Sequence, residues 1–306
     1  MGKIAFVFSG QGAQYPGMGK ELYEASPAAR AVFDCVEAIR PGTRKQCFEG
    51  TQEELSVTIN TQPCMFCVDL AAAQAVRELG ITPDAVAGFS LGEVAALTFA
   101  QAFDLETGFR LVCKRAALMQ EAAEKHEGAM VAVLKLSGEE VRELCAGREN
   151  TYPVNYNSSA QTVVALAKSE REGFCAAVKQ QGGKAVPLAV SGGFHSPFME
   201  EAAERLLREL QTIEVKKPVL PVYANSTAKP YKDEIKTVLA AQVDHPVYWQ
   251  STIENMAAEG VTVFIEAGAG KTLSGLIKKI IPNARIYNVE DRAGLQALAG
   301  IKEELC

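Results

Sequence analysis

Gly88-Phe89-Ser90-Leu91-Gly92 matches the G-x-S-x-G pattern of a serine on a sharp turn between a strand and a helix. The apolar run Ala85-Val86-Ala87 precedes this turn, and a helical stretch from Val94 to Phe103 follows it. On such a turn the serine hydroxyl is exposed above the sheet, and the two glycines let the helix pack close to the strand. The pattern therefore predicts a nucleophile at Ser90. The alternative is a tight turn around a buried serine without a chemical role.

Short strands alternate with helices on both sides of the turn. We expect strands over residues 3–8, 85–89, 218–224, 261–266 and 284–289. We expect helices over residues 17–25, 64–79, 91–102, 106–124, 232–243, 250–259, 271–279 and 293–305. This alternation is typical of an α/β fold, in which helices cover both faces of a mostly parallel sheet.

A segment with a different order interrupts this alternation. It has the pattern of strand, helix, strand, strand, helix and strand, over residues 129–134, 138–145, 153–157, 162–167, 170–181 and 184–190. That order is ferredoxin-like. We therefore expect a catalytic core made of residues 1–126 and 192–306, with an inserted subdomain over residues 127–191. Ligand sites prefer the interface between two such units, which predicts a cleft between them.

The composition is that of an ordinary globular protein. The chain has 306 residues, of which 48% are apolar and 22% charged, and its net charge is −6. No apolar run approaches the ~20 residues of a membrane helix, and the negative charge argues against a general nucleic-acid binder. No cleavage-site pattern follows the apolar run at residues 4–8, so we expect no signal peptide and a cytoplasmic location.

The eight cysteines show no disulfide-framework spacing, which favours reduced thiols. Cys64 and Cys67 form a single C-x-x-C, for which a zinc or redox site is the lesser alternative to two thiols on one helix face. No ligand cluster is present, and we predict no metal.

The general base that the serine needs must come from three histidines, His126, His195 and His245. His126 lies in a polar helix end and His245 in a loop, whereas His195 precedes Ser196-Pro197, which predicts the start of a helix over residues 197–210. The positive end of a helix disfavours a protonated histidine, which keeps a neutral imidazole available. No acidic residue is placed as a third member, so we predict a dyad held by a backbone carbonyl. The alternative is a histidine packed at a hinge.

Arg115 interrupts the apolar side of the predicted helix over residues 106–124. It stands three residues after Val112 and four before Met119, both of which belong to the apolar stripe. A buried-side arginine must either extend its side chain to the surface or meet an anion, and its planar fork fits a carboxylate. Helix geometry alone leaves both alternatives open.

Two glycine-containing loops follow predicted strands. The loop Ser9-Gly10-Gln11-Gly12-Ala13-Gln14 can present backbone N–H groups to an oxyanion, but it lacks the third glycine of a dinucleotide-binding fingerprint. The segment Gly268-Ala269-Gly270-Lys271-Thr272 imitates a P-loop, but Ile265 stands where the first glycine is needed. We therefore exclude nucleotide hydrolysis.

Six segments together, in order along nearly the whole chain, resemble the malonyl-coenzyme A:acyl carrier protein transacylases. They are Phe8 to Gln14, Gly88 to Glu93, Arg115 with Met119-Gln120, Asn155 to Ser158, Phe194-His195-Ser196 and Pro246 to Trp249. The resemblance implies an α/β-hydrolase-like core that carries a ferredoxin-like subdomain, in agreement with the organisation described above.

The resemblance also implies roles for individual residues. These are an acylated nucleophile at Ser90, a general base and acid at His195, oxyanion-binding N–H groups at Gln11 and Leu91, a malonyl-carboxylate partner at Arg115, a main-chain carbonyl near Gln242 that orients the base, and a bulky residue at Phe194 that excludes a 2-methyl branch. The chain departs from the usual family pattern at Phe89, where histidine is common, and at Ser159-Ala160 and Ala269, where Pro-Gly and proline are common. Because Phe89 lies in the serine turn, we expect it to affect acyl preference.

The implied reaction is the transfer of a malonyl group from malonyl-coenzyme A to the phosphopantetheine thiol of acyl carrier protein, in fatty acid biosynthesis. We expect a monomer that needs no cofactor. A serine thioesterase or hydrolase would explain Ser90 and His195 but not Arg115. A polyketide acyltransferase and a non-catalytic module that docks a carrier protein are further alternatives.

Overall fold

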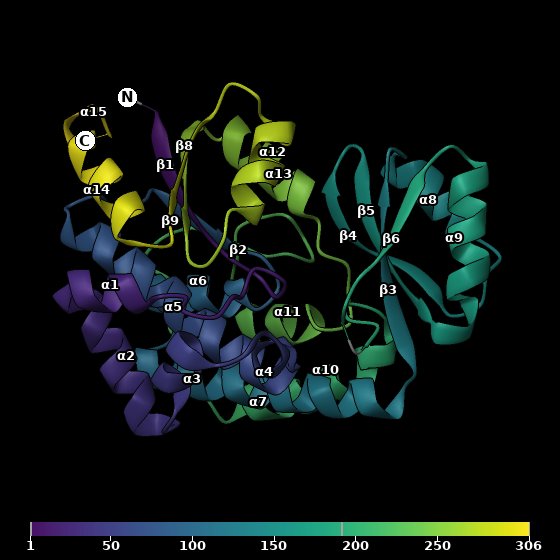
Figure 1. The fold of residues 1–306 in the computed structure, drawn as a ribbon, viewed down its shortest axis with the longest axis horizontal. Coiled ribbons are helices and arrows are strands. Elements are labelled where there is room, and N and C mark those ends of the chain that lie inside the picture. The colour runs from purple at the N-terminus through teal and green to yellow at the C-terminus, as the bar shows by residue number, and fades with distance from the viewer. Residues whose placement is uncertain (1, 191, 306) are drawn as a thin grey trace.

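The computed structural model describes residues 2–190 and 192–305 and contains two sheets (Figure 1). Met1, Ser191 and Cys306, which stand at the ends of the expected domain segments, lie outside the described residues. The larger sheet belongs to the part that carries both termini, and the smaller sheet lies beside it (Figure 1).

The larger sheet is parallel and has the strand order β7-β2-β1-β8-β9. Its strands are β1 (Lys3–Phe8), β2 (Ala85–Gly88), β7 (Val222–Tyr223), β8 (Val261–Ala267) and β9 (Arg285–Val289). Helices cover both faces, as the alternation of strands and helices predicted. The α/β fold class is therefore confirmed.

The alternating side chains of β1 separate two cores. Ile4, Phe6 and Phe8 pack in the larger core with α5 (Thr58–Glu78), α6 (Gly92–Phe99) and α7 (Leu105–Lys125). Ala5 and Val7 face the opposite way, into a smaller core with α12 (Trp249–Ala258) and α13 (Thr272–Ile280). Because successive strand residues point to opposite faces, the unbroken apolar run Ile4 to Phe8 of β1 is what a sheet covered on both sides requires.

The smaller sheet is antiparallel, with the order β4-β5-β3-β6. Its elements are β3 (Gly128–Leu134), α8 (Gly138–Cys145), β4 (Thr151–Ser158), β5 (Gln161–Ala167), α9 (Arg171–Gln180) and β6 (Lys184–Pro187). The chain order agrees with the predicted ferredoxin-like order. Val131 and Val133 pack against α8 and α9, whereas Met130 and Ala132 belong to the core shared with the larger sheet.

Several elements differ from the sequence-based expectation. Three helices were not predicted: α2 (Pro27–Ile39), α3 (Thr43–Glu49) and α4 (Gln52–Ser56). Helix α5 begins six residues earlier than expected and contains Pro63. The strand expected over residues 218–224 is only the two-residue β7, and the expected C-terminal helix is divided into α14 (Arg292–Gly300) and α15 (Lys302–Leu305). The remaining helices are α1 (Lys20–Ala25), α10 (Glu200–Gln211) and α11 (Ile235–Ala241).

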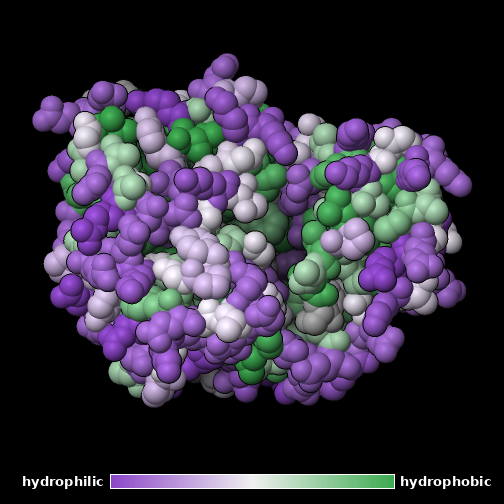
Figure 2. Space-filling view, viewed as in Figure 1, coloured by the Kyte–Doolittle hydropathy of each residue, from purple (hydrophilic) through white to green (hydrophobic). Residues whose placement is uncertain are grey.

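Strand β4 joins the smaller sheet to the rest of the protein. Val247 accepts a backbone hydrogen bond from Tyr156 at 2.9 Å and donates one to Val154 at 2.7 Å. The rings of Tyr156 and Tyr248 stack with centroids 5.3 Å apart. A cavity of about 410 Å³ lies between the two sheets, and Figure 2 shows a hollow there, bordered partly by apolar surface.

No described helix is both long and apolar enough to cross a membrane. Within residues 2–190 and 192–305, no group of three or more histidine, cysteine or acidic side chains could hold a metal ion.

Candidate active site

Ser90 lies at the turn between β2 and α6, with a backbone φ of 56°. The two flanking glycines are required by close backbone contacts. A Cβ atom on Gly88 would lie 1.9 Å from the backbone of Gly92, and a Cβ on Gly92 would lie 2.5 Å from the carbonyl oxygen of Phe8. The strained serine and the two glycines have the geometry of a nucleophile elbow. The predicted turn is confirmed.

His195 contacts Ser90 and the main chain of Gln242. Its Nε2 lies 2.8 Å from the Ser90 Oγ, and its Nδ1 lies 2.8 Å from the Gln242 carbonyl oxygen. Because a carbonyl oxygen can only accept, the proton of neutral His195 is on Nδ1 and the Nε2 lone pair faces the serine. The Ser90 hydroxyl therefore donates to His195, as a general base requires.

Burial and the nearby Arg115 charge lower the pKa of His195 to about 4. The imidazole is therefore neutral near pH 7. This cause differs from the helix-end effect expected from the sequence. A short 3₁₀ turn, Pro197–Met199, precedes α10, and the Ser196 hydroxyl donates to the Gly193 carbonyl and does not cap a helix.

The other two histidines lie elsewhere. His126 is exposed at the end of α7. His245 is exposed beside Asp244, whose carboxylate lies 2.7 Å from its Nδ1. Neither contacts Ser90 in the described part of the chain, so the dyad predicted from the sequence is the pair that the fold brings together.

Arg115 is 1% exposed and ends beside Ser90, so the alternative in which its side chain extends to solvent is wrong. Its Nη1 donates to Gln62 Oε1 at 2.7 Å, and its Nη2 donates to Gln242 Oε1 at 2.8 Å and to Ser90 Oγ at 3.2 Å. Its Nε has no partner among the described residues. The Nε–H of the guanidinium therefore remains available to bind an anion.

The charge of Arg115 is not balanced by a direct ion pair among the described residues. Burial lowers its pKa to about 10, and the nearby carboxyl group of Glu93 opposes this effect. A buried cation with a free donor is costly unless an anion completes the site. The arrangement therefore favours a substrate that brings its own negative charge.

The two backbone N–H groups expected to form an oxyanion hole lie in the loop after β1 and at the turn itself. Neither the Gln11 nor the Leu91 N–H has an acceptor among the described residues. The loop approaches the turn closely, because a Cβ on Gly10 would lie 2.8 Å from the Phe89 carbonyl oxygen. The two N–H groups are thus free to bind an oxygen atom, but their catalytic role stays a prediction.

The cavity between the sheets is lined by the loop after β1, by Phe89 and by the inner face of the smaller sheet. Asn155 and Asn157 line it too, and their Oδ1 atoms are buried without a partner among the described residues. Phe89 also packs edge-on against Trp249, with ring centroids 5.5 Å apart. Phe194 is buried in the larger core and is not among the described lining residues, so its effect on selectivity stays a prediction.

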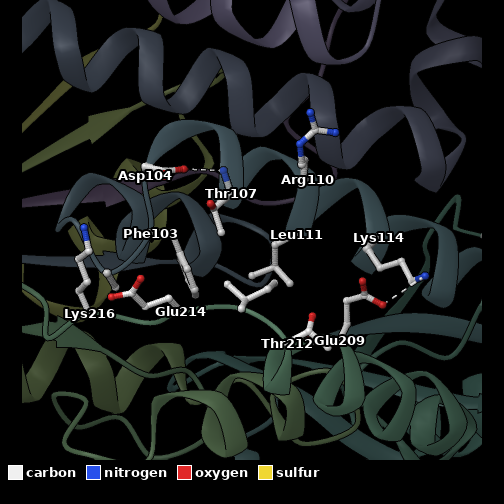
Figure 3. A pocket seen from close by; sticks show the side chains of 12 residues that line it. Phe103, Asp104, Thr107, Arg110, Leu111, Lys114, Glu209, Thr212, Glu214 and Lys216 are labelled. Carbon is white, nitrogen blue, oxygen red and sulfur yellow. Dashed lines mark hydrogen bonds and ion pairs between the residues drawn. The ribbon is translucent and has the colours of Figure 1, made fainter.

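A second pocket lies along the N-terminal half of α7 (Figure 3). Its rim carries the ion pair Lys114–Glu209, at 3.3 Å, and the cap bond from the Thr107 N–H to Asp104, at 2.7 Å. Its described lining contains no histidine or cysteine. It therefore lacks a nucleophile and base pair, and we do not assign the reaction to it.

Sequence reasoning missed the polar side chains behind the elbow. Asn225 Oδ1 accepts from the Ser90 N–H at 2.7 Å, and Gln242 Nε2 donates to the Ser90 carbonyl at 2.6 Å. Glu93 accepts from Tyr231, Gln242 and the Asn225 N–H. A signal was present: Glu93 is the one charged residue of a short helix whose residues are all buried.

Comparison with known proteins agrees with this geometry. The family model of the acyl transferase domain matches residues 5–291. The malonyl CoA-acyl carrier protein transacylase of Bacillus subtilis strain 168 is 40% identical, over 99% of each chain. This chain belongs to the malonyl-CoA:acyl carrier protein transacylase family.

Solved structures of other acyltransferases share its fold. The malonyl CoA-acyl carrier protein transacylase of Clostridium perfringens is 37% identical, with a TM-score of 0.94, over 99% of this chain and 98% of that chain. A malonyl transacylase solved in complex with a type II polyketide acyl carrier protein is 34% identical, with a TM-score of 0.93, over 97% and 99% of the two chains. The protein is therefore an acyltransferase.

Proposed function

We propose that this acyltransferase moves a malonyl group from malonyl-coenzyme A to the phosphopantetheine thiol of an acyl carrier protein, through a malonyl ester on Ser90. The observation that carries the proposal is the position of Arg115. It is buried, it has an unpaired Nε–H, and its Nη2 lies 3.2 Å from the Ser90 hydroxyl oxygen. A hydrolase of neutral esters has no use for such a cation, whereas a malonyl carboxylate pairs with it.

In the first half-reaction the Ser90 oxygen attacks the thioester carbonyl while His195 Nε2 takes the hydroxyl proton. The carbonyl oxygen becomes an oxyanion, which the Gln11 and Leu91 N–H groups stabilise. The carbon–sulfur bond then breaks, and His195 returns its proton to the leaving coenzyme A thiolate. In the second half-reaction the carrier thiol gives its proton to His195 and attacks the ester, and Ser90 leaves as the alcohol.

The cavity supports a pantetheine thioester as the donor and the acceptor. A pantetheine arm carries amide N–H groups, and the unpartnered Oδ1 atoms of Asn155 and Asn157 are acceptors for them. Arg115 fixes the carboxylate end of the acyl group, so the thiol that enters through the cavity meets the ester in a defined orientation. The thiol thereby gains an advantage over water.

The cellular setting belongs to the same proposal. We propose fatty acid biosynthesis as the pathway and a cytoplasmic monomer as the active form; the curated relative from Bacillus subtilis, a malonyl CoA-acyl carrier protein transacylase, supports the pathway. The relative solved with a polyketide carrier favours polyketide biosynthesis as the second candidate. We propose that no cofactor takes part beyond the phosphopantetheine thiols of the two substrates.

The test is to mix the purified protein with malonyl-coenzyme A and to weigh it intact, beside Ser90→Ala. A gain of one malonyl group that needs Ser90 and that a phosphopantetheinylated carrier protein removes is the expected result. An adduct lost to water at the same rate with and without the carrier would instead indicate a hydrolase.

The Arg115→Ala variant tests the substrate class. We expect it to lose about 2–4 kcal/mol of malonyl transition-state binding, roughly 30- to 1000-fold in kcat/KM, because a charge-assisted pair disappears. Acetyl-coenzyme A, which has no carboxylate, is the control substrate. Equal activity of the native protein toward acetyl and malonyl thioesters would contradict the proposal.

A further inference from the structure

Arg115 has a long, flexible side chain, so its orientation depends on the groups that hydrogen-bond to its guanidinium. Two of its donors are held by amide oxygens, and the bond from Nη2 to Gln242 Oε1, at 2.8 Å, is the one next to Ser90. The direction of the Gln242 amide therefore decides where the free Nε–H of the guanidinium points.

The surroundings of the Gln242 Nε2 allow only one direction of that amide. Its neighbours are all acceptors: the Ser90 carbonyl at 2.6 Å, Glu93 Oε2 at 3.1 Å and Asn225 Oδ1 at 3.2 Å. A reversed amide would face these acceptors with its oxygen, and it would face the Arg115 donor with its NH₂ group. Both contacts would be repulsive in a buried site.

Glu93 is the anchor of this arrangement. Its side chain is fully buried, and besides Gln242 it accepts from the Tyr231 hydroxyl and from the Asn225 N–H at 3.0 Å. It makes no ion pair among the described residues, and Arg115 is the only cation that acts on it there. The Gln242 amide thus stands between a buried cation and a buried carboxyl group, and bonds to both.

We propose that Glu93, held by Tyr231, is a positioning residue that sets the direction of Arg115 through the Gln242 amide and so makes the site selective for acyl groups that carry a carboxylate. This inference rests on the proposed function. It assigns to Glu93 no contact with the substrate. It predicts that substitution of Glu93 reduces the selectivity for malonyl over acetyl groups much more than it reduces the reactivity of Ser90.

Two substitutions at one position separate hydrogen bonding from mere packing. Glu93→Met removes both acceptor oxygens at similar length, whereas Glu93→Gln keeps an oxygen that can accept from Gln242 and Asn225. We expect kcat/KM for malonyl-coenzyme A to fall roughly 10- to 100-fold in Glu93→Met, because the Gln242 amide that orients Arg115 loses its Glu93 acceptor, and to recover to within about 5-fold of native in Glu93→Gln.

Serine reactivity is measured separately with phenylmethanesulfonyl fluoride, a neutral reagent that needs Ser90 and His195 but not Arg115. We expect its labelling rate, and the acetyl-coenzyme A rate, to stay within about 3-fold of native in both variants. Asp69→Asn is the matched control, because Asp69 is a fully buried carboxyl group with no side-chain contact to this network, and it should keep the native malonyl-to-acetyl ratio.

Three results would overturn the inference: an unchanged malonyl-to-acetyl ratio in Glu93→Met, equal losses for both acyl groups and the sulfonyl fluoride, or a Glu93→Gln variant as defective as Glu93→Met. If Glu93→Met does not fold, Tyr231→Phe carries the test, with a smaller loss of roughly 3- to 10-fold for malonyl alone. If the native protein forms no malonyl adduct, the proposed function itself is contradicted. If the native protein forms the adduct normally and the variants keep the native malonyl-to-acetyl ratio, only the inference about Glu93 is contradicted.

Discussion

Removing the Arg115 charge should make His195 a stronger base. Burial is the main cause of the low His195 pKa, about 4, and the Arg115 charge is the second. Both groups contact the Ser90 oxygen, at 2.8 and 3.2 Å, so the guanidinium and the imidazole are at most about 6 Å apart. At an effective dielectric constant of about 20 a unit charge at that distance contributes about 2.8 kcal/mol, or about 2 pH units.

The direction follows from the charges. A cation disfavours protonation of a neighbouring imidazole, so its removal in Arg115→Ala raises the pKa of His195 from about 4 toward about 6. The measurement is the rate of Ser90 labelling by phenylmethanesulfonyl fluoride between pH 5 and 8, followed by intact mass. We expect a flat profile in the native protein. In Arg115→Ala we expect a rate that falls as the pH drops through about 6, because the base becomes protonated.

Arg115→Lys is the control, since it keeps a positive charge at the site and should keep the flat profile. A profile in Arg115→Ala that stays flat down to pH 5 would refute the reasoning. It would mean that burial alone sets the His195 pKa.

Three further predictions concern stability. Gly92→Ala should lower the free energy of unfolding by about 1–3 kcal/mol in urea titrations, because its Cβ would lie 2.5 Å from the Phe8 carbonyl oxygen. Gly275→Ala in α13 should raise the free energy of unfolding by about 0.4–1 kcal/mol, because the added Cβ would meet no neighbouring side chain or strand within 4 Å. A Gly92 variant as stable as the native chain would contradict the close packing at the elbow. Burial and Glu266 raise the pKa of Asp69, so the native fold holds a proton that the unfolded chain releases above about pH 4. Asp69→Asn should therefore gain stability relative to the native chain by up to about 1.4 kcal/mol per pH unit from about pH 5 upward, and a pH-independent difference would contradict this.

The elbow and the sheet were predictable because their determinants are local. Two residues before and two residues after Ser90, only glycine fits the close backbone contacts. The apolar run of β1 indicates a strand that is covered on both faces. Helix α2 had local signals as well, since the Ser26 hydroxyl caps it and Pro27 begins it. Helix α5 began earlier than predicted because Pro63, which suggests a helix boundary, is accommodated inside it.

The partners of Glu93 in the network behind the elbow were not predictable from local patterns, although Glu93 itself stands out in a buried helix. The Gln242 carbonyl that contacts His195 is a backbone atom and leaves no mark in the sequence; its contact was expected only from the family resemblance. Glu93 and Asn225 are 132 positions apart and meet only because β2 and β7 are neighbours in the sheet. Such contacts depend on the tertiary arrangement, which a single sequence does not contain.

The backbone hydrogen bonds at Val247 couple the smaller sheet to the part of the chain that supports His195. The backbone bonds of Val247 to Val154 and Tyr156 tie the smaller sheet to a stretch of chain that begins only five residues earlier, at Gln242, with the carbonyl next to His195. A displacement of the smaller sheet at this junction would therefore be transmitted, over five residues of backbone, to the carbonyl group that contacts His195.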